Sequence, residues 1–231
     1  MCLLHFRQKK EASPFRTRSI AENIQIFKDM KDGKYKEGEV CMRLKIDAAH
    51  PNPTMRDPVM YRVKDHPHPK TGTAWKIYPT YDFTHCLCDS LENITHSLCT
   101  LEFEIRRDLY YWILDSLDMY KPVVWEYSRL NISNSVLSKR KLLRLIQSKA
   151  VSGWEDPRLL TINALRKRGV RPEAINSFVD LVNVSRRGNE NVIDSRLLDY
   201  CVRQDLEGIV TRTMAVLDPI QLIITNFNEF K

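Results

Sequence analysis

The most regular spacing of apolar residues lies near the beginning of the chain. Ser19 and Glu22 have the spacing of a helix capping box, and apolar side chains then recur at helical intervals from Ile20 to Met30. Gly33 follows the last of them and is typical of a helix end. The pattern therefore predicts one short helix that ends before Gly33.

Short apolar or alternating stretches, separated by proline-rich loops, follow this helix. They are VCMRLKID at 40–47, VMYRV at 59–63 and AWKIYP at 74–79. Runs of this kind between turn-forming residues predict β-strands.

From residue 82 the apolar pattern alternates between helical and extended segments. We expect a helix through residue 91, a strand at 94–100, an amphipathic helix with apolar residues over 109–117, and a strand at 123–130. Strand, helix and strand in this order predict part of a parallel α/β sheet.

After Asn131 helical patterns dominate. Thr161 has the character of a cap for INALRKR before Gly169, and Pro172 stands at a first-turn position. The segment SRLLDYCVRQDL at 195–206 is a further helix candidate. The last part of the chain is therefore expected to be helical.

Composition favours a folded protein with an anionic partner. The 231 residues are 43% hydrophobic, and 36 Lys and Arg against 29 acidic residues give a net charge of +7. The cations gather at 139–144, 166–171 and 186–187. A nucleic acid is thus favoured as a partner without being required.

The six cysteines are irregularly spaced, and no secretory signal precedes them. We therefore expect a reduced, cytoplasmic chain. No apolar stretch has the length that a bilayer requires, so we expect no membrane partner.

A cluster of thiols and imidazoles raises the alternative of a zinc site. It comprises His85, Cys86, Cys88, His96 and Cys99. A single residue separates Cys86 from Cys88, whereas paired zinc ligands favour a wider spacing, and no second cysteine pair follows. We therefore expect small buried thiols rather than a tightly bound metal.

The stretch SVLSKRKL at 135–142 permits two readings, a solvated helix start or a mobile phosphate clamp. A lone basic run is more often a solvated helix face. Three neighbouring blocks favour the second reading: WEYSRLN at 125–131, GWEDPRLLTINALRKRG at 153–169, and IYPTYDFTHCLCDSLENITHSLCTLEF at 77–103. Together these blocks resemble the second half of the catalytic core of class I glutaminyl-tRNA synthetases, with glutamyl-tRNA synthetases as close relatives. The likeness extends from about Ser13 to Phe227.

This resemblance implies an α/β fold built around a partial Rossmann-type parallel sheet at 77–131. An α+β segment that binds the acceptor stem would precede it at 13–76. A helical subdomain at 132–227 would follow, with a KMSKS-type loop and contacts to the tRNA stem. Residues 1–12 do not resemble the family and form an unassigned tail, and residues 228–231 form a second tail.

VLSKR at 136–140 resembles the family's KMSKS signature, whose loop closes over ATP. Lys139 offers a mobile cation for the charge that builds on the phosphates, and Ser138 offers a hydroxyl and a backbone N–H. These two residues are the catalytic candidates. Val136 and Arg140 depart from the signature, as they do in glutaminyl relatives.

The implied ATP contacts are Thr100, Arg129, Leu130, Leu137, Ser138 and Lys139. A Rossmann-type sheet places ligands at the carboxyl ends of its strands, where Thr100 and Arg129 are expected. Without the neighbouring blocks, Arg129 would be read as a surface cation and Thr100 as a helix cap.

The implied glutamine contacts are Tyr81, His85, Ser97, Cys99 and Phe103. Glutamyl relatives carry an arginine at the Cys99 position, where it can pair with the substrate carboxylate, so a neutral thiol favours glutamine. Val124 counts slightly against glutamine, because some glutaminyl relatives have a glutamine at that position. Ordinary aromatic packing stays an alternative for Tyr81 and Phe103.

The resemblance implies tRNA, ATP with Mg²⁺ and L-glutamine as partners, and it is compatible with a multi-synthetase assembly. Cations expected to contact tRNA phosphates are Lys141, Arg144, Arg166, Lys167, Arg168 and Arg171. The expected reaction is glutamine–tRNA ligation through a glutaminyl-adenylate. Alternatives are a glutamyl-tRNA ligase and a non-catalytic tRNA-binding remnant.

One family signature is missing from this sequence. The histidines stand at positions 5, 50, 66, 68, 85 and 96, and no two form His-X-Gly-His. In the family this signature faces the ATP phosphates from a helix N-terminus. We therefore expect an interior piece of a synthetase that forms no glutaminyl-adenylate alone, because positioning both ends of ATP makes the attack effectively unimolecular.

Overall fold

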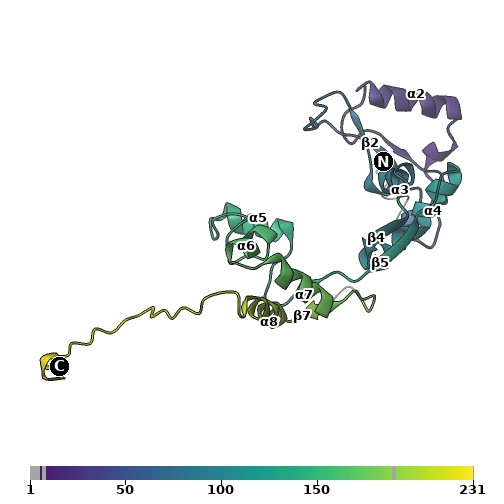
Figure 1. Ribbon diagram of the computed structural model, residues 1–231. Helices are drawn as coiled ribbons and strands as arrows, with labels where there is room; N and C mark the ends of the chain where they lie inside the picture. Colours follow the sequence, from purple (N-terminus) through teal and green to yellow (C-terminus); the bar gives the residue numbers. More distant parts are fainter. Residues whose placement is uncertain (1–5, 7–8, 189–190, 231) are drawn as a thin grey trace. The chain divides into compact units, whose positions relative to one another are not determined.

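A computed structural model describes residue 6, residues 9–188 and residues 191–230, and the chain divides into two compact units. The first unit is Met1–Arg129 with Val184–Asn191, and the second is Leu130–Asn183 with Val192–Lys231 (Figure 1). Residues 1–5 and 7–8 of the expected tail, and residue 231, lie outside the described residues.

The first unit begins with a 3₁₀ turn, η1 (Pro14–Thr17), and the predicted helix, α2 (Ile20–Lys31). The Ser19 hydroxyl oxygen accepts a hydrogen bond from the Glu22 N–H at 3.2 Å, which confirms the cap. Gly33 follows with a φ of +76°, a conformation that side chains disfavour. The capping residues therefore determine where this helix starts and ends.

A three-stranded antiparallel sheet follows, with β2 (Val59–Val63) between β1 (Cys41–Arg43) and β3 (Ile77–Pro79). All three predicted strands are present, two of them shorter than expected. Tyr61 pairs with Pro79, so this sheet extends past the expected boundary at residue 76. A short 3₁₀ turn, η2 (Pro53–Met55), stands before β2.

The rest of the first unit alternates helix and strand, as predicted. Its elements are α3 (Tyr81–Leu91), β4 (His96–Thr100), η3 (Leu101–Arg106), α4 (Arg107–Ser116) and β5 (Val123–Tyr127). Strands β4 and β5 pair in parallel, with Ser97 opposite Val124 and Cys99 opposite Glu126. This pairing confirms the predicted parallel arrangement.

The main core lies where α3 and α4 pack against this sheet. Leu114 is fully buried and contacts a cluster that includes Cys86, Leu109 and Ile113. Alternation along β4 buries Ser97 beneath these helices, and the neighbouring Leu98 is 62% exposed. One face of the parallel pair is therefore packed and the other carries exposed apolar side chains.

The second unit contains the helices α5 (Lys139–Gln147), α6 (Ile162–Lys167), α7 (Pro172–Val182) and α8 (Ser195–Leu206). It also contains a parallel pair that the pattern did not predict, β6 (Asn131–Ile132) and β7 (Val192–Ile193). Two-residue strands are too short to show alternation, and their partners lie far apart in sequence. Phe178 and Leu198 are buried where α7 packs on α8.

The loop between α5 and α6 is held by one nearly buried carboxylate. Asp156 accepts hydrogen bonds from the backbone N–H of Ser152 at 2.9 Å and of Arg158 at 3.0 Å, and from the Arg158 guanidinium. These contacts, led by the Arg158 side chain, hold the pKa of Asp156 far below its usual range. The carboxylate of Asp156 thus fixes the conformation of the GWEDPR loop.

The helical part ends at Leu206, before Gly208 with a φ of +82°. Residues 210–226 have no regular secondary structure beyond turns, so the expected helical subdomain to residue 227 is helical only to Leu206. A final 3₁₀ turn, η4, spans Phe227–Phe230. Within the described residues, no helix has both the length and the apolarity needed to cross a membrane.

Replacing Leu114 by alanine tests the core of the first unit. We expect a loss of about 2–5 kcal/mol in the free energy of unfolding, because the side chain is fully buried and its cavity would fill only in part. Urea unfolding followed by circular dichroism measures it. The control is Leu117→Ala, at a 52% exposed position just beyond α4, which should cost far less. Equal losses in both variants would contradict this core.

Replacing Asp194 by alanine tests the cap of α8. The carboxylate accepts from the Arg196 N–H at 2.9 Å, and the Arg196 guanidinium lowers the pKa of Asp194 to about 2. A depressed pKa stabilises the folded state above the ordinary value of about 4, and this contribution is lost as the pH falls towards 2.

The difference in unfolding temperature between the wild type and Asp194→Ala should therefore be full at pH 7 and shrink over that range. Asp194→Asn, which keeps an acceptor that does not titrate, should approach the wild type at low pH. A difference that is independent of pH would exclude this linkage.

Candidate functional site

A small pocket that is open to solvent lies where α3, η3 and α4 meet the parallel strands of the first unit. Four of the five predicted glutamine contacts line it, namely Tyr81, His85, Cys99 and Phe103. The other lining residues are Asp82, Arg106, Arg107, Leu109, Tyr110, Val124 and Glu126. The fold thus places four of the predicted glutamine contacts around one pocket.

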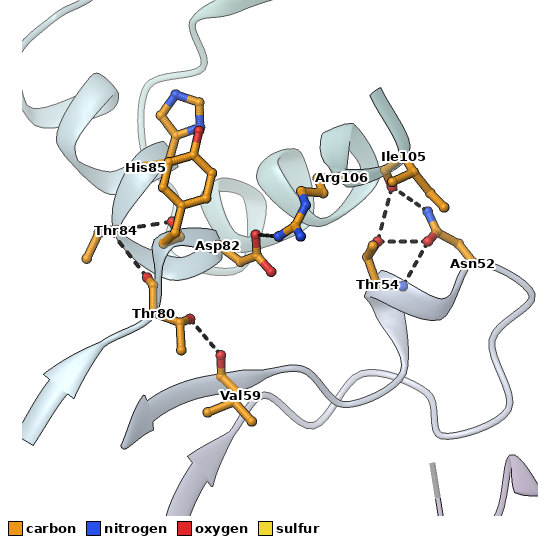
Figure 2. A network of polar contacts seen from close by, with 10 residues as sticks. Asn52, Thr54, Val59, Thr80, Asp82, Thr84, His85, Ile105 and Arg106 are labelled. Atoms are coloured by element: carbon orange, nitrogen blue, oxygen red, sulfur yellow. Dashed lines mark hydrogen bonds and ion pairs between the residues drawn. The ribbon is translucent and has the colours of Figure 1, made fainter. Parts of the chain in front are cut away.

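Tyr81 and His85 lie in the first turns of α3, directly after its N-cap residue Thr80. The Thr80 hydroxyl donates to the Val59 carbonyl at 2.7 Å and ties the start of α3 to β2 (Figure 2). Tyr81 and His85 are one helical turn apart, and their rings stack at 5.1 Å between centroids. The Tyr81 hydroxyl lies 3.3 Å from His85 Nδ1.

Ser97 lies behind the pocket rather than in its lining. Its hydroxyl donates to Asp89 Oδ2 at 2.7 Å, and its oxygen lies 3.2 Å from His85 Nε2. The Tyr110 hydroxyl donates to the same Asp89 oxygen at 3.0 Å. Ser97 therefore supports His85 instead of facing the cavity.

Tyr81 and Cys99 contribute a hydroxyl and a thiol to the lining of the pocket. Burial raises the pKa of the Tyr81 hydroxyl, and the neighbouring Cys99 raises it further. Burial also raises the pKa of the Cys99 thiol. Both groups consequently keep their hydrogens in the physiological range.

Both arginines of the lining are already paired. Arg106 forms an ion pair with Asp82, and Arg107 forms a two-bond pair with Glu126, which is 1% exposed. The pair raises the pKa of Arg107 further. The lining residues, all within the described ranges, therefore offer no unpaired guanidinium.

The segment 184–191 adds a third cation to this group. Its Ser185 carbonyl accepts from the Ser128 N–H at 2.6 Å. Arg186 then lies 3.3 Å from Glu104 and 3.9 Å from Glu126, with its guanidinium 5.7 Å from the centre of the Trp125 ring. The Glu126 charge is thus compensated from two sides.

Contacts with η2 fix η3, which carries Arg106. Asn52 Nδ2 donates to the Ile105 carbonyl at 2.8 Å, and the Thr54 hydroxyl donates to the same oxygen at 3.1 Å (Figure 2). Figure 2 also shows Asp82 and Arg106 pointing towards each other. Part of the expected acceptor-binding segment thereby helps to shape the pocket.

The predicted ATP contacts fall in both units. Thr100 is the last residue of β4 and precedes η3 without a side-chain capping bond, and exposed Arg129 follows β5. In the second unit Leu130 is exposed and Leu137 is partly buried. Ser138 stands at the N-cap of α5 without a capping bond, and Lys139 is exposed in the first turn.

The cations expected to contact tRNA divide into two groups. Among the described residues, Lys141, Arg144, Arg166 and Lys167 are exposed and form no ion pair. Arg168 lies 3.6 Å from Asp199, and Arg171 contacts Glu173 at 3.3 Å and Asp205 at 3.6 Å. The first group is thus freely available to an anion.

The cysteine and histidine cluster is divided by the fold. Cys86 is buried in the core, and burial raises its pKa to about 11, whereas Cys88 is exposed. In the part of the chain that the structure describes, no group of three His, Cys, Asp or Glu side chains could hold a metal.

Sequence reasoning missed Asp82, Asp89, Arg106, Arg107, Tyr110 and Glu126. The alternation of β5 was a usable signal for Glu126, because it stands two residues after Val124 and shares its face. The two arginines lie at the junction of η3 and α4, where no simple period applies.

The sequence is similar to a family of known proteins. The family described as tRNA synthetases class I (E and Q), catalytic domain, matches residues 3–208. A probable glutamine–tRNA ligase of Dictyostelium discoideum is 56% identical over 225 residues, covering 97% of this chain and 29% of that protein. A glutamine–tRNA ligase of Lupinus luteus is 50% identical over 221 residues, covering 96% of this chain and 28% of that protein.

A bacterial relative, the glutamine–tRNA ligase of Polynucleobacter necessarius, is 50% identical over 230 residues, covering 97% of this chain. The chain spans 28–39% of the length of these three relatives. Because the family match covers most of the residues, including the whole pocket, the chain belongs to the class I tRNA synthetases (E and Q), within their catalytic domain.

Proposed function

We propose that this chain carries the amino-acid pocket and the phosphate loop of a glutamine–tRNA ligase. In this reaction the glutamine carboxylate attacks the α-phosphorus of ATP, pyrophosphate leaves, and the terminal hydroxyl of tRNA then takes the glutaminyl group. The observation that carries the proposal is the charge state of the pocket. The similarity to glutamine–tRNA ligases supports it.

Selection between glutamine and glutamate is a choice between a neutral carboxamide and a carboxylate of equal size. A carboxylate that enters the pocket finds Arg106 and Arg107 already paired with Asp82 and Glu126. It would lose its hydration without gaining a cation, which is costly. A carboxamide needs only neutral partners, and Tyr81 and Cys99 supply them.

The phosphates of ATP would be held at the start of α5 in the second unit. The Ser138 hydroxyl is not used as a cap, and the first N–H groups of a helix favour anions. Exposed Lys139 would add a mobile cation for the charge of the transition state. ATP would arrive with Mg²⁺ as the substrate complex.

The tRNA would contact the exposed cations of α5 and α6. Lys141 and Arg144 lie on α5, Arg166 and Lys167 on α6, and a backbone of phosphates binds such groups with a strong dependence on salt. A second candidate function, tRNA binding without turnover, is favoured by one observation, the absence of His-X-Gly-His from this sequence.

Pyrophosphate exchange tests the proposed reaction. The chain mixed with a polypeptide that carries His-X-Gly-His should exchange pyrophosphate into ATP when glutamine and tRNA are present, and the chain alone should not. Lys139→Ala should lower the rate by about 100-fold, because it removes a cation that acts on the transition state. Lys45→Ala, at an exposed position elsewhere, should not change it.

Three results would count against the proposed reaction: equal rates with glutamate, an active Lys139→Ala variant, or no exchange in any mixture. Binding of tRNA without exchange would favour the second candidate. Exchange by the chain alone would show that the missing signature is dispensable.

Removing the partner of Arg106 tests whether paired charges determine the selection of glutamine over glutamate. Asp82→Asn leaves Arg106 without its carboxylate partner inside the pocket, so a substrate carboxylate gains a cation. The ratio of glutamate to glutamine affinity should rise by about tenfold. Calorimetric titration measures it, with Asp118→Asn in the exposed turn after α4 as the control. An unchanged ratio would show that paired charges do not exclude glutamate.

A further inference from the structure

A second small pocket in the first unit shares no lining residue with the pocket at α3, η3 and α4. It lies between the beginning of the chain and the segment that runs from β1 to the end of η2. Most of its lining side chains are charged or carry a hydroxyl group, namely Glu11, Ser13, Arg43, Arg56 and Asp57. The pocket is therefore suited to an ionic group.

Arg43, the last residue of β1, brings an unused hydrogen-bond donor to this pocket. Its Nη1 atom donates to the Asp57 carbonyl at 2.7 Å, which holds the guanidinium in place. Its Nε atom is buried and has no hydrogen-bond partner among the described residues. Buried N–H groups are almost always paired, so this donor requires an acceptor in the pocket.

Arg56, which follows η2, adds a second guanidinium to the lining. Its Nε atom donates to the His50 carbonyl at 2.6 Å, and its Nη2 atom donates to the Pro51 carbonyl at 2.9 Å. In the ranges that the structure describes, neither Arg43 nor Arg56 forms an ion pair. Both cations are thus bound to neutral backbone oxygens, whereas the arginines of the other pocket are paired with carboxylates.

The two carboxylates of the lining leave these cations uncompensated. Asp57 is already engaged, because its Oδ2 atom accepts from Arg16 at 2.8 Å and its Oδ1 atom accepts from the Ile46 N–H at 2.8 Å. Glu11 is exposed, and its side chain has no printed bond to any described residue. With Arg16 included, three cations stand against two carboxylates, an excess that favours an anion.

Ser13 supplies a hydroxyl group that can carry an anion into this lining. It is the only serine or threonine in the sequence that precedes a proline, and Arg16 completes the pattern Ser-Pro-x-Arg, which proline-directed protein kinases favour. Residues 11–12 before it have no regular secondary structure, and Ser13 itself is extended, with φ −65° and ψ 141°. Kinases bind extended segments, so the same residue lines the pocket and matches a kinase substrate.

We propose that Ser13 is a phosphorylation site and that Arg43 and Arg56 hold its phosphate in this pocket. Ser13 Oγ attacks the γ-phosphorus of ATP in the kinase, the bond to ADP breaks, and the hydroxyl proton passes to the base of the kinase. The phosphate then brings nearly two negative charges and three acceptor oxygens to two guanidinium groups. The proposal does not depend on the proposed function.

The pKa of the phosphate tests this contact without any substitution. The chain with phosphoserine encoded at position 13 is titrated and followed by ³¹P NMR. Guanidinium groups favour the dianion, so the second pKa, ordinarily about 6, should lie at least about one pH unit lower than in the phosphorylated peptide of residues 9–17. Equal values in the chain and the peptide would overturn the proposal.

Substitutions in the phosphorylated chain identify the cations. Arg43→Gln and Arg56→Gln should each bring the pKa back towards that of the peptide, and Glu11→Gln should lower it further. Arg62→Gln, at an exposed position on β2, removes the same charge and should leave the pKa low. An equal rise in Arg62→Gln would overturn the assignment to the pocket. A poorly folded Arg43→Gln does not protect the proposal, because the titration of the unsubstituted chain decides it.

Inorganic phosphate and a kinase identify the source of the phosphate. With ¹⁵N-arginine, the Arg43 Nε–H signal, assigned by its loss in Arg43→Gln, should move on phosphorylation of Ser13 and stay unmoved when inorganic phosphate is added to the unphosphorylated chain. Movement with inorganic phosphate alone would make free phosphate the ligand and overturn the role of Ser13. A cyclin-dependent kinase with MgATP should phosphorylate the folded chain but not Ser13→Ala, and failure to modify Ser13 would overturn the modification.

Discussion

The parallel register of β4 and β5 is the constraint on which the pocket depends. Ser97 pairs with Val124 and Cys99 with Glu126, and alternation along each strand turns these residues towards α3 and α4. A slip of one residue would send the same side chains to the opposite face and bring Leu98 and Trp125 beneath the helices. The register of the two strands therefore determines which side chains reach the pocket, whatever rotamers they adopt.

The carboxylates around the pocket have two kinds of partner. The carboxylates of Asp82 and Glu126 are satisfied by arginines at the side of the pocket, whereas Asp89 is satisfied by two hydroxyl groups and an imidazole behind it. Ion pairs of this kind are not strong evidence of stability, since desolvation offsets much of their attraction. Under the proposed function their clearer effect is on selection, because a paired guanidinium offers little to an incoming carboxylate.

The sequence predicted what depends on local spacing. The cap of α2 and the turn that separates Tyr81 from His85 follow from short-range chemistry, as does the order of β4, α4 and β5. Pairs such as Arg107 with Glu126, 19 residues apart, depend on how a helix and a strand pack, and no local pattern carries that information. The short β6–β7 pairing joins segments about 60 residues apart, and the local sequence pattern did not predict it for the same reason. Ser97, one of the predicted glutamine contacts, lies behind the lining of the pocket, because strand alternation predicts which face a side chain is on but not how deeply it is buried.

The division of the chain into two units separates the pocket from the start of α5. All the residues that line the pocket, and the polar contacts behind them, belong to the first unit, as does Arg186, which lies near Glu126. Ser138, Lys139 and the exposed cations predicted to contact tRNA belong to the second unit. The pocket and the hydrogen bonds behind it are thus a local property of one packed unit. At the start of α5 in the second unit the Ser138 side chain makes no capping hydrogen bond, and Lys139 is exposed beside it. Under the proposed function these two groups are available to a phosphate, because the first N–H groups of a helix favour anions.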